Sequence, residues 1–171
     1  MDFANLALGA VILVTLTSLT LLINRDWRIS LIALAAQYIG VFILVALEWP
    51  VSLAAPKLLA GWMAGTVLGM NLIGSGPAEG SGENQTPSPN RLSGQIIRLL
   101  AATLAGLVVI SIAPGLDAWL PGLTLEQAWG GSILMGVGLL QLGFTTRPFY
   151  ITLGLLTVIS GFEIFYLSLI H

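Results

Sequence analysis

Long apolar stretches fill most of this 171-residue chain and constrain its fold more than any other feature. A membrane-spanning helix needs about 20 mostly apolar residues. Six such stretches can be drawn, roughly at 3–23, 29–48, 51–73, 95–113, 128–146 and 149–170. With 56% hydrophobic and 8% charged residues, the composition also lies outside the range of soluble globular proteins. The sequence therefore predicts an all-α integral membrane protein with six transmembrane helices in a lipid bilayer.

The arginines predict how these helices are oriented. Short cytoplasmic loops carry an excess of Lys and Arg. Threading six spans places every arginine on one face: Arg25, Arg28, Arg91, Arg98 and Arg147. The opposite face receives Asp2, Glu48, Asp117, Glu126 and His171, and no arginine. We therefore expect the arginine face to be cytoplasmic and both termini to lie on the outer face, in a bacterial inner or plasma membrane.

One long polar segment divides the chain near its middle. It reads GSGPAEGSGENQTPSPN from about Gly74 to Asn90, and its Gly, Ser, Pro and Asn residues offer no apolar face to bury. We expect a flexible cytoplasmic linker over 75–92. It separates a first three-helix half, 1–74, from a second three-helix half, 93–171.

Two ionisable residues, Lys57 and Glu163, stand well inside apolar stretches. A lysine at the centre of a spanning helix costs about 2.5 to 3.5 kcal/mol on insertion scales, so such a residue normally marks an ion path or a partner. At 1.5 Å per residue from the outer helix ends, Lys57 lies ~9 Å deep and Glu163 ~12 Å deep. They could therefore meet. Pro56 lacks an N–H and is expected to open or bend the helix beside the lysine.

Two further polar residues extend this candidate site. Gln37 is about halfway through the second stretch, and Ser160 lies one turn before Glu163. With Lys57 and Glu163 they could form a hydrogen-bonded proton path. The alternatives are ordinary interhelical hydrogen bonds for the uncharged pair, and a structural ion pair for the charged pair. Glycines repeat at helical spacing and favour close helix packing, notably Gly61, Gly65 and Gly69.

Several kinds of chemistry lack the residues that they need. The chain has no cysteine, so thiolate metal sites and iron–sulfur ligation are excluded, and its single histidine is terminal. No phosphate-binding loop, nucleophile triad or pair of catalytic carboxylates is present. With a net charge of −2 and no basic patch, nucleic-acid binding is not expected. We predict no catalytic residue, cofactor or metal in this chain.

The polar residues and their surroundings resemble a family. The resemblance rests on three segments: Arg28-Ile-Ser followed by Gln37, Ala55-Pro56-Lys57-Leu58-Leu59, and Arg147 followed by Gly154-Leu155-Leu156 and Glu163. They resemble component E of group-four energy-converting hydrogenases. That component is similar to the small K-type membrane subunit of respiratory complex I and to the C subunit of multisubunit cation/proton antiporters. K-type subunits differ in having three helices and two glutamates.

This resemblance implies a function. The chain would be a small membrane subunit of a proton- or sodium-translocating redox or antiporter complex, with Glu163 and Lys57 in its hydrophilic axis. Its partners would be antiporter-like subunits and the membrane subunits of a quinone or hydrogenase module. The subunit would not be catalytic alone, although it could belong to an oxidoreductase related to NADH–quinone oxidoreductase. Two alternatives stay open, a non-catalytic scaffold or assembly subunit and a self-contained small transporter.

Overall fold

The computed structural model describes residues 3–47, 49–74, 90–120 and 122–170, and it is built of helices there. The α-helices are α1 (Phe3–Ile23), α2 (Trp27–Ala46), α3 (Val51–Gly74), α5 (Asn90–Ile112), α6 (Leu125–Gly143) and α7 (Pro148–Ile170). A short 3-10 helix, η1 (Ala113–Ala118), continues from the end of α5. None of the described residues forms a strand, which confirms the predicted all-α class.

Local sequence signals explain where several helices begin. Asp26 caps α2, because its carboxylate accepts a hydrogen bond from the backbone N–H of Arg28. Thr124 and Gln127 form a reciprocal capping box at the start of α6. Pro148 opens α7 at a position where its missing N–H leaves no hydrogen bond unmade. These caps fix the turns that join the helices at both ends of the bundle.

The helices agree closely with the predicted stretches, with a few shifts. α1 has the predicted bounds, and α2 begins two residues before the predicted 29. α5 begins at Asn90, so residues 90–92 of the expected linker are helical. The rest of that linker, 75–89, lies outside the described residues, as do Asp2, Glu48 and His171.

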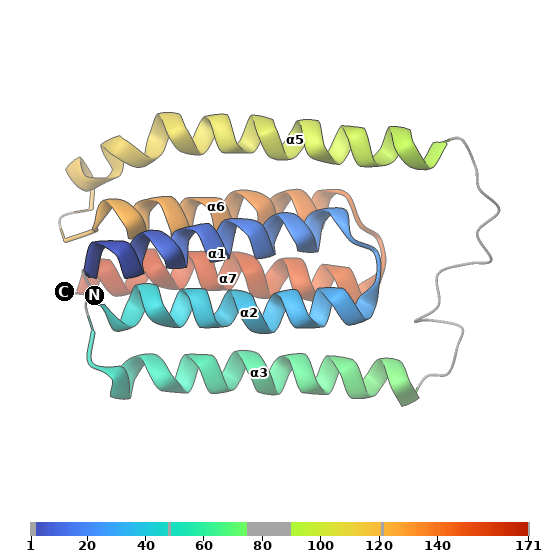
Figure 1. Cartoon of the computed structure of the whole chain (residues 1–171), viewed down its shortest axis with the longest axis horizontal. Helices are drawn as coiled ribbons and strands as arrows, with labels where there is room; N and C mark the ends of the chain where they lie inside the picture. The colour runs from blue at the N-terminus through green and yellow to red at the C-terminus, as the bar shows by residue number, and fades with distance from the viewer. Residues whose placement is uncertain (1–2, 48, 75–89, 121, 171) are drawn as a thin grey trace.

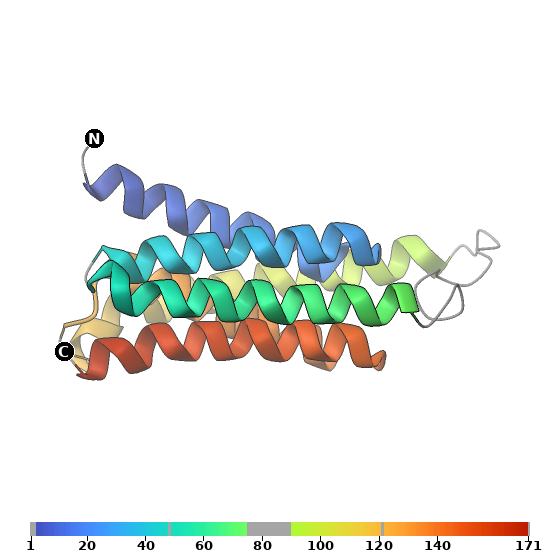
Figure 2. The same ribbon diagram turned by 90° about the horizontal axis from the view of Figure 1, so that it is seen from below.

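Four helices form the centre of the bundle, and two flank it. α1, α2, α6 and α7 pack together, α3 lies along α2, and α5 lies along α6 (Figures 1 and 2). The central core includes Val14, Leu44, Leu134 and Ile164, one from each central helix and each at most 1% exposed. Helix directions alternate, so the start of α1 and the end of α7 lie at the same end of the bundle (Figure 1).

Glycines set the closest helix approaches, as the sequence predicts. A Cβ on Gly138 of α6 would lie 2.9 Å from the backbone nitrogen of Val158 in α7. The α3 stripe faces α2, where Gly61 lies under the ring of Tyr38. Gly65 and Gly69 face two leucines of the same helix, Leu34 and Leu31. The small residues therefore let neighbouring backbones and one aromatic ring approach closely.

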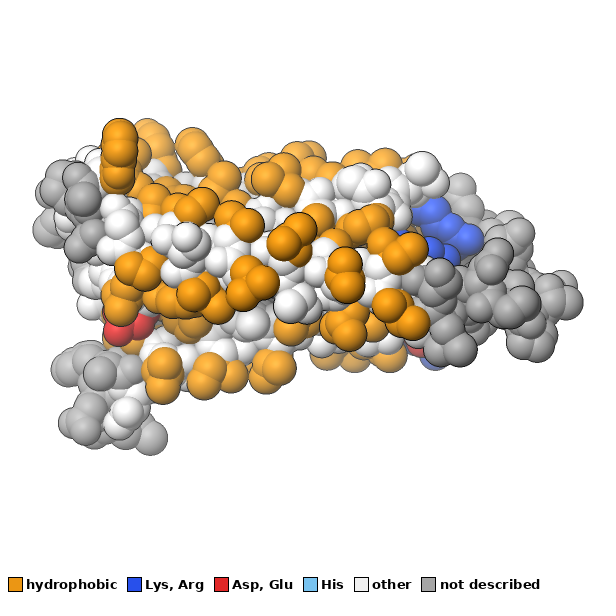
Figure 3. Space-filling model, turned by 90° about the horizontal axis from the view of Figure 1, so that it is seen from above, with side chains coloured by type: hydrophobic (Ala, Val, Ile, Leu, Met, Phe, Trp, Pro, Cys, Tyr) orange, Lys and Arg blue, Asp and Glu red, His pale blue; other side chains and the backbone are white. Residues whose placement is uncertain are grey.

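Large apolar side chains are exposed along the length of the bundle (Figure 3). Four segments are long and apolar enough to cross a membrane: Asn5–Ile23, Trp27–Ala46, Gly94–Leu116 and Pro148–Ile170. α3 and α6 are of similar length and carry more glycine than the other helices. Membrane-crossing helices are thus supported for four segments.

Arginines gather at the end of the bundle opposite the start of α1. Arg25 and Arg28 lie where α1 turns into α2, and Arg147 lies where α6 turns into α7. Arg98 of α5 donates to the carbonyl oxygens of Leu22 and Phe144, each at 3.0 Å. Those carbonyls belong to the C-terminal ends of α1 and α6, where a cation is favoured. Arg98 therefore fastens α5 to two central helices.

Candidate functional site

The two deep charges meet. The Lys57 Nζ atom lies 2.6 Å from a Glu163 carboxylate oxygen, Oε2, and this ion pair joins α3 to α7. Lys57 is six residues beyond the start of α3, and Glu163 seven residues before the end of α7. At 1.5 Å per residue, the pair lies about 10 Å along the helix axes from the end of the bundle where α3 begins and α7 ends. Counting along the sequence predicted that contact at this depth was possible.

The two partners differ in exposure. The Lys57 side chain is 12% exposed, whereas that of Glu163 is 41% exposed. On α7, Glu163 is flanked along the sequence by two exposed aromatic residues, Phe162 and Tyr166, whose rings stack on each other. The lysine is therefore held inside the protein, and the carboxylate is open toward the bundle surface.

The proline before the lysine does not interrupt its helix. α3 runs unbroken from Val51 to Gly74 with Pro56 inside it. The structure therefore shows no break in α3 at Pro56. Pro56 has no N–H to donate to the carbonyl of Ser52, so that acceptor loses its usual helical partner.

Tyr38 of α2 lies next to the site, and the sequence did not indicate it. Its side chain is close to those of Ser160 and Glu163. The Ser160 hydroxyl donates to the backbone carbonyl of Leu156 in its own helix at 2.9 Å. The Tyr38 ring reaches this position by lying over Gly61, one turn beyond Lys57. That glycine was predicted only as a packing residue.

Gln37, the remaining predicted site residue, lies deeper and faces another way. It is fully buried, and its stripe on α2 continues into Val41 and Leu44 of the central core. Its amide has no hydrogen-bond partner among the described residues. A buried amide without a partner costs about 1 to 3 kcal/mol, and such groups call for a functional or structural explanation. The structure thus joins Lys57 and Glu163 in an ion pair, and among the described residues Gln37 has no hydrogen bond to either of them.

The fold and site define a class: a protein whose described residues form helices, four of them containing segments long and apolar enough to cross a membrane, with an ion pair that joins two helices. No family model matches the sequence, and comparisons with curated proteins and with solved structures find no match either. The resemblance to component E of energy-converting hydrogenases therefore stays a prediction.

Proposed function

We propose that the chain is a small membrane subunit of a proton- or sodium-translocating redox or antiporter complex. In this role Glu163 takes up and releases a proton, and Lys57 adjusts how readily it does so. The observation that carries the proposal is the 2.6 Å ion pair between α3 and α7, about 10 Å inside the bundle. Ionisable residues at membrane depth are costly and most often serve ion or proton movement.

The pair has the chemistry of a proton-operated switch. A carboxylate beside an ammonium group is stabilised as the anion. When the carboxylate takes up a proton, the attraction that holds Lys57 disappears and an uncompensated cation is left 12% exposed. The lysine must then lose a proton or find another anion. Proton arrival at Glu163 is thereby coupled to the charge of α3.

The exposed side of Glu163 favours a subunit over an isolated protein. A carboxylate that is 41% exposed at this depth would face lipid hydrocarbon, which is costly. A polar surface of a neighbouring subunit, or a water-filled passage between subunits, would remove this cost. The antiporter-like, quinone-module or hydrogenase-module subunits implied by the resemblance are the partners that we propose.

The orientation belongs to the same proposal. All six helices would cross the membrane, with the arginine end of the bundle in the cytoplasm and both termini outside. Support comes from Arg25, Arg28, Arg98 and Arg147, which share one end of the bundle. The ion pair would then lie in the outer half of the bilayer.

A scaffold is the strongest alternative, because the same ion pair could simply fix the position of α3 against α7. Pairing across two helices supports this alternative as well, and only a functional test separates the two. A self-contained transporter would call for helices broken at matching positions in the two halves. α3 is unbroken at Pro56, which favours the subunit over the transporter.

Proton pumping by the parent complex in sealed vesicles tests the proposal. Glu163→Gln keeps the size and hydrogen-bonding capacity of the side chain and removes the titrating group. Glu126→Gln, in the first turn of α6 near the bundle end, is the matched control. We expect Glu163→Gln to abolish pumping at normal assembly and Glu126→Gln to retain it. Normal pumping by Glu163→Gln would reject the proton role and favour the scaffold.

A further inference from the structure

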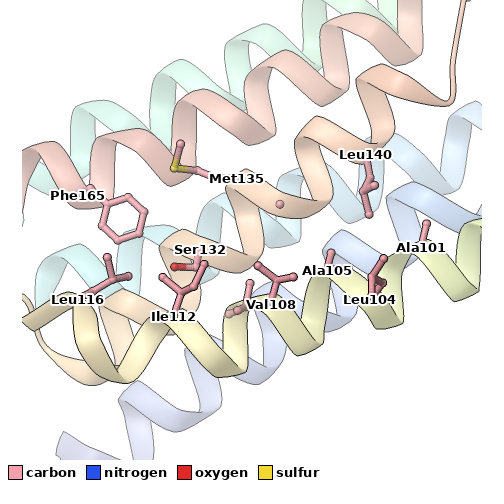
Figure 4. Close-up of a pocket in the computed structure, with 12 residues that line it drawn as sticks. Ala101, Leu104, Ala105, Val108, Ile112, Leu116, Ser132, Met135, Leu140 and Phe165 are labelled. Carbon is pink, nitrogen blue, oxygen red and sulfur yellow. The ribbon is translucent and has the colours of Figure 1, made fainter.

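A groove of about 480 Å³ runs between α5 and α6 (Figure 4), and α5 flanks the bundle on the side opposite α3 (Figure 1). Ala101 and Leu140 line one end of it, and Leu116 and Phe165 line the other. All of its lining side chains are apolar except Ser132. From Ala101 to Ile112 the groove follows α5 for ~16 Å at 1.5 Å per residue.

The groove exists because the facing residues are too small to fill the space between the two helices. Gly136 of α6 faces Ala105 of α5, and a Cβ added to the glycine would still be 3.9 Å from the alanine. The large residues of α5 that flank this stripe, such as Leu100 and Leu107, are turned outward and highly exposed. The small facing residues therefore leave a slot that opens on the outer surface of the bundle.

We propose that this slot binds one acyl chain of an anionic phospholipid. Water would need two to four polar partners there, and the lining offers one hydroxyl, that of Ser132. A partner helix, with a diameter of about 10 to 12 Å, is too wide to enter between α5 and α6. A hydrocarbon chain is narrow enough. The ~16 Å that the groove follows along α5 is about the thickness of one leaflet of a ~30 Å hydrocarbon core.

Arg98 supplies the charge that selects an anionic headgroup. It precedes Ala101 by three residues and Ala105 by seven, so it shares their face of α5 at the arginine end of the groove. Its hydrogen bonds to Leu22 and Phe144 use its two terminal nitrogens, each of which carries a further N–H. Arg25 is close enough to add to the local positive charge. A phosphate here would satisfy these donors while its acyl chain filled the slot.

The first experiment uses the unaltered chain. The purified protein is placed in phosphatidylcholine vesicles that contain a minor fraction of phosphatidylglycerol with a photoreactive acyl chain. Irradiation should cross-link the lipid to groove residues such as Ser132, Met135 and Ile112, as mapped by peptide mass spectrometry. Cross-links spread evenly over the exposed faces of α3 and α5 would overturn the proposal.

The second experiment measures retained lipid by native mass spectrometry. Ala105→Phe fills the slot, and Thr103→Phe adds the same ring on the exposed face of α5 as the matched control. We expect Ala105→Phe alone to lose the bound lipid. Gly136→Leu fills the slot from α6 and serves if the first variant does not fold. Retention of lipid by a folded slot-filling variant would refute the site.

The headgroup is tested by comparing phosphatidylglycerol with phosphatidylcholine at equal concentration. We expect the unaltered chain to prefer the anionic lipid about fivefold, which corresponds to ~1 kcal/mol for one arginine near an anionic surface. Arg98→Gln should remove that preference and leave acyl-chain binding in place. An equal preference in the two proteins would refute the role of Arg98.

Discussion

We expect the loss of Glu163 and the loss of Lys57 to destabilise the protein by different amounts. Removal of Glu163 leaves a lysine that is only 12% exposed without its carboxylate, whereas removal of Lys57 leaves a carboxylate that is 41% exposed. Breaking a fully buried pair costs about 3 to 5 kcal/mol, and an exposed pair contributes about 0.2 to 1 kcal/mol. Because Lys57 is buried and Glu163 is open to the surface, we expect a coupling free energy of about 2 kcal/mol, which lies between these two ranges.

A double-mutant cycle measures this coupling. Lys57→Met and Glu163→Leu are made singly and together, because both replacements keep side-chain volume and remove charge. The free energy of unfolding is followed by circular dichroism as the detergent-solubilised protein is titrated with a denaturing detergent. We expect Glu163→Leu to be the more damaging single change. The double variant should be close to the unaltered protein, because replacing both members of such a pair with apolar groups is often neutral.

Two outcomes would refute this reasoning. Additive effects of the two single changes would mean that the 2.6 Å contact contributes nothing to stability. A larger loss for Lys57→Met than for Glu163→Leu would contradict the argument from exposure. Additivity would also weaken the scaffold alternative, since that role depends on the pair holding α3 against α7.

Two further predictions concern glycines. Gly138→Ala should destabilise the protein by about 1 to 3 kcal/mol, because its Cβ would press on the Val158 backbone; Gly106→Ala, with nothing within 4 Å, should be neutral or stabilising in the same unfolding titration. Gly61→Ala should be similarly destabilising because it displaces the Tyr38 ring, while Gly65→Ala, 3.8 Å from Leu34, should be tolerated. Equal effects within either pair would contradict the packing described above.

Much of the fold was predictable because apolar length alone defines a spanning helix. The stretch 3–23 coincides with α1, and the others differ from their helices by a few residues at the ends. The predicted start of α5 is too late, because the first turn of this helix is polar and polar residues are also typical of a linker. Which helices pack together could not be predicted, because Leu- and Ile-rich surfaces fit one another in many ways.

The contact between Lys57 and Glu163 was predictable, because it depends on how deep each residue lies along its helix. The positions of Lys57 and Glu163 along their helices put them at one level, and the structure brings them into contact. The sequence did not predict Tyr38 as a site residue, because an aromatic residue in an apolar helix gives no indication of which residues it will contact. Its role depends on which face of α3 meets α2, and that is set by the tertiary packing of Gly61.

The ion pair has a consequence for how the chain is made. Its lysine emerges from the ribosome about 100 residues before its glutamate, which at 5 to 20 residues per second is a delay of roughly 5 to 20 seconds. During that time the lysine of α3 is without its carboxylate partner. The contact between α3 and α7 can therefore form only after α7 has been synthesised, so it is a late step in the folding of this chain.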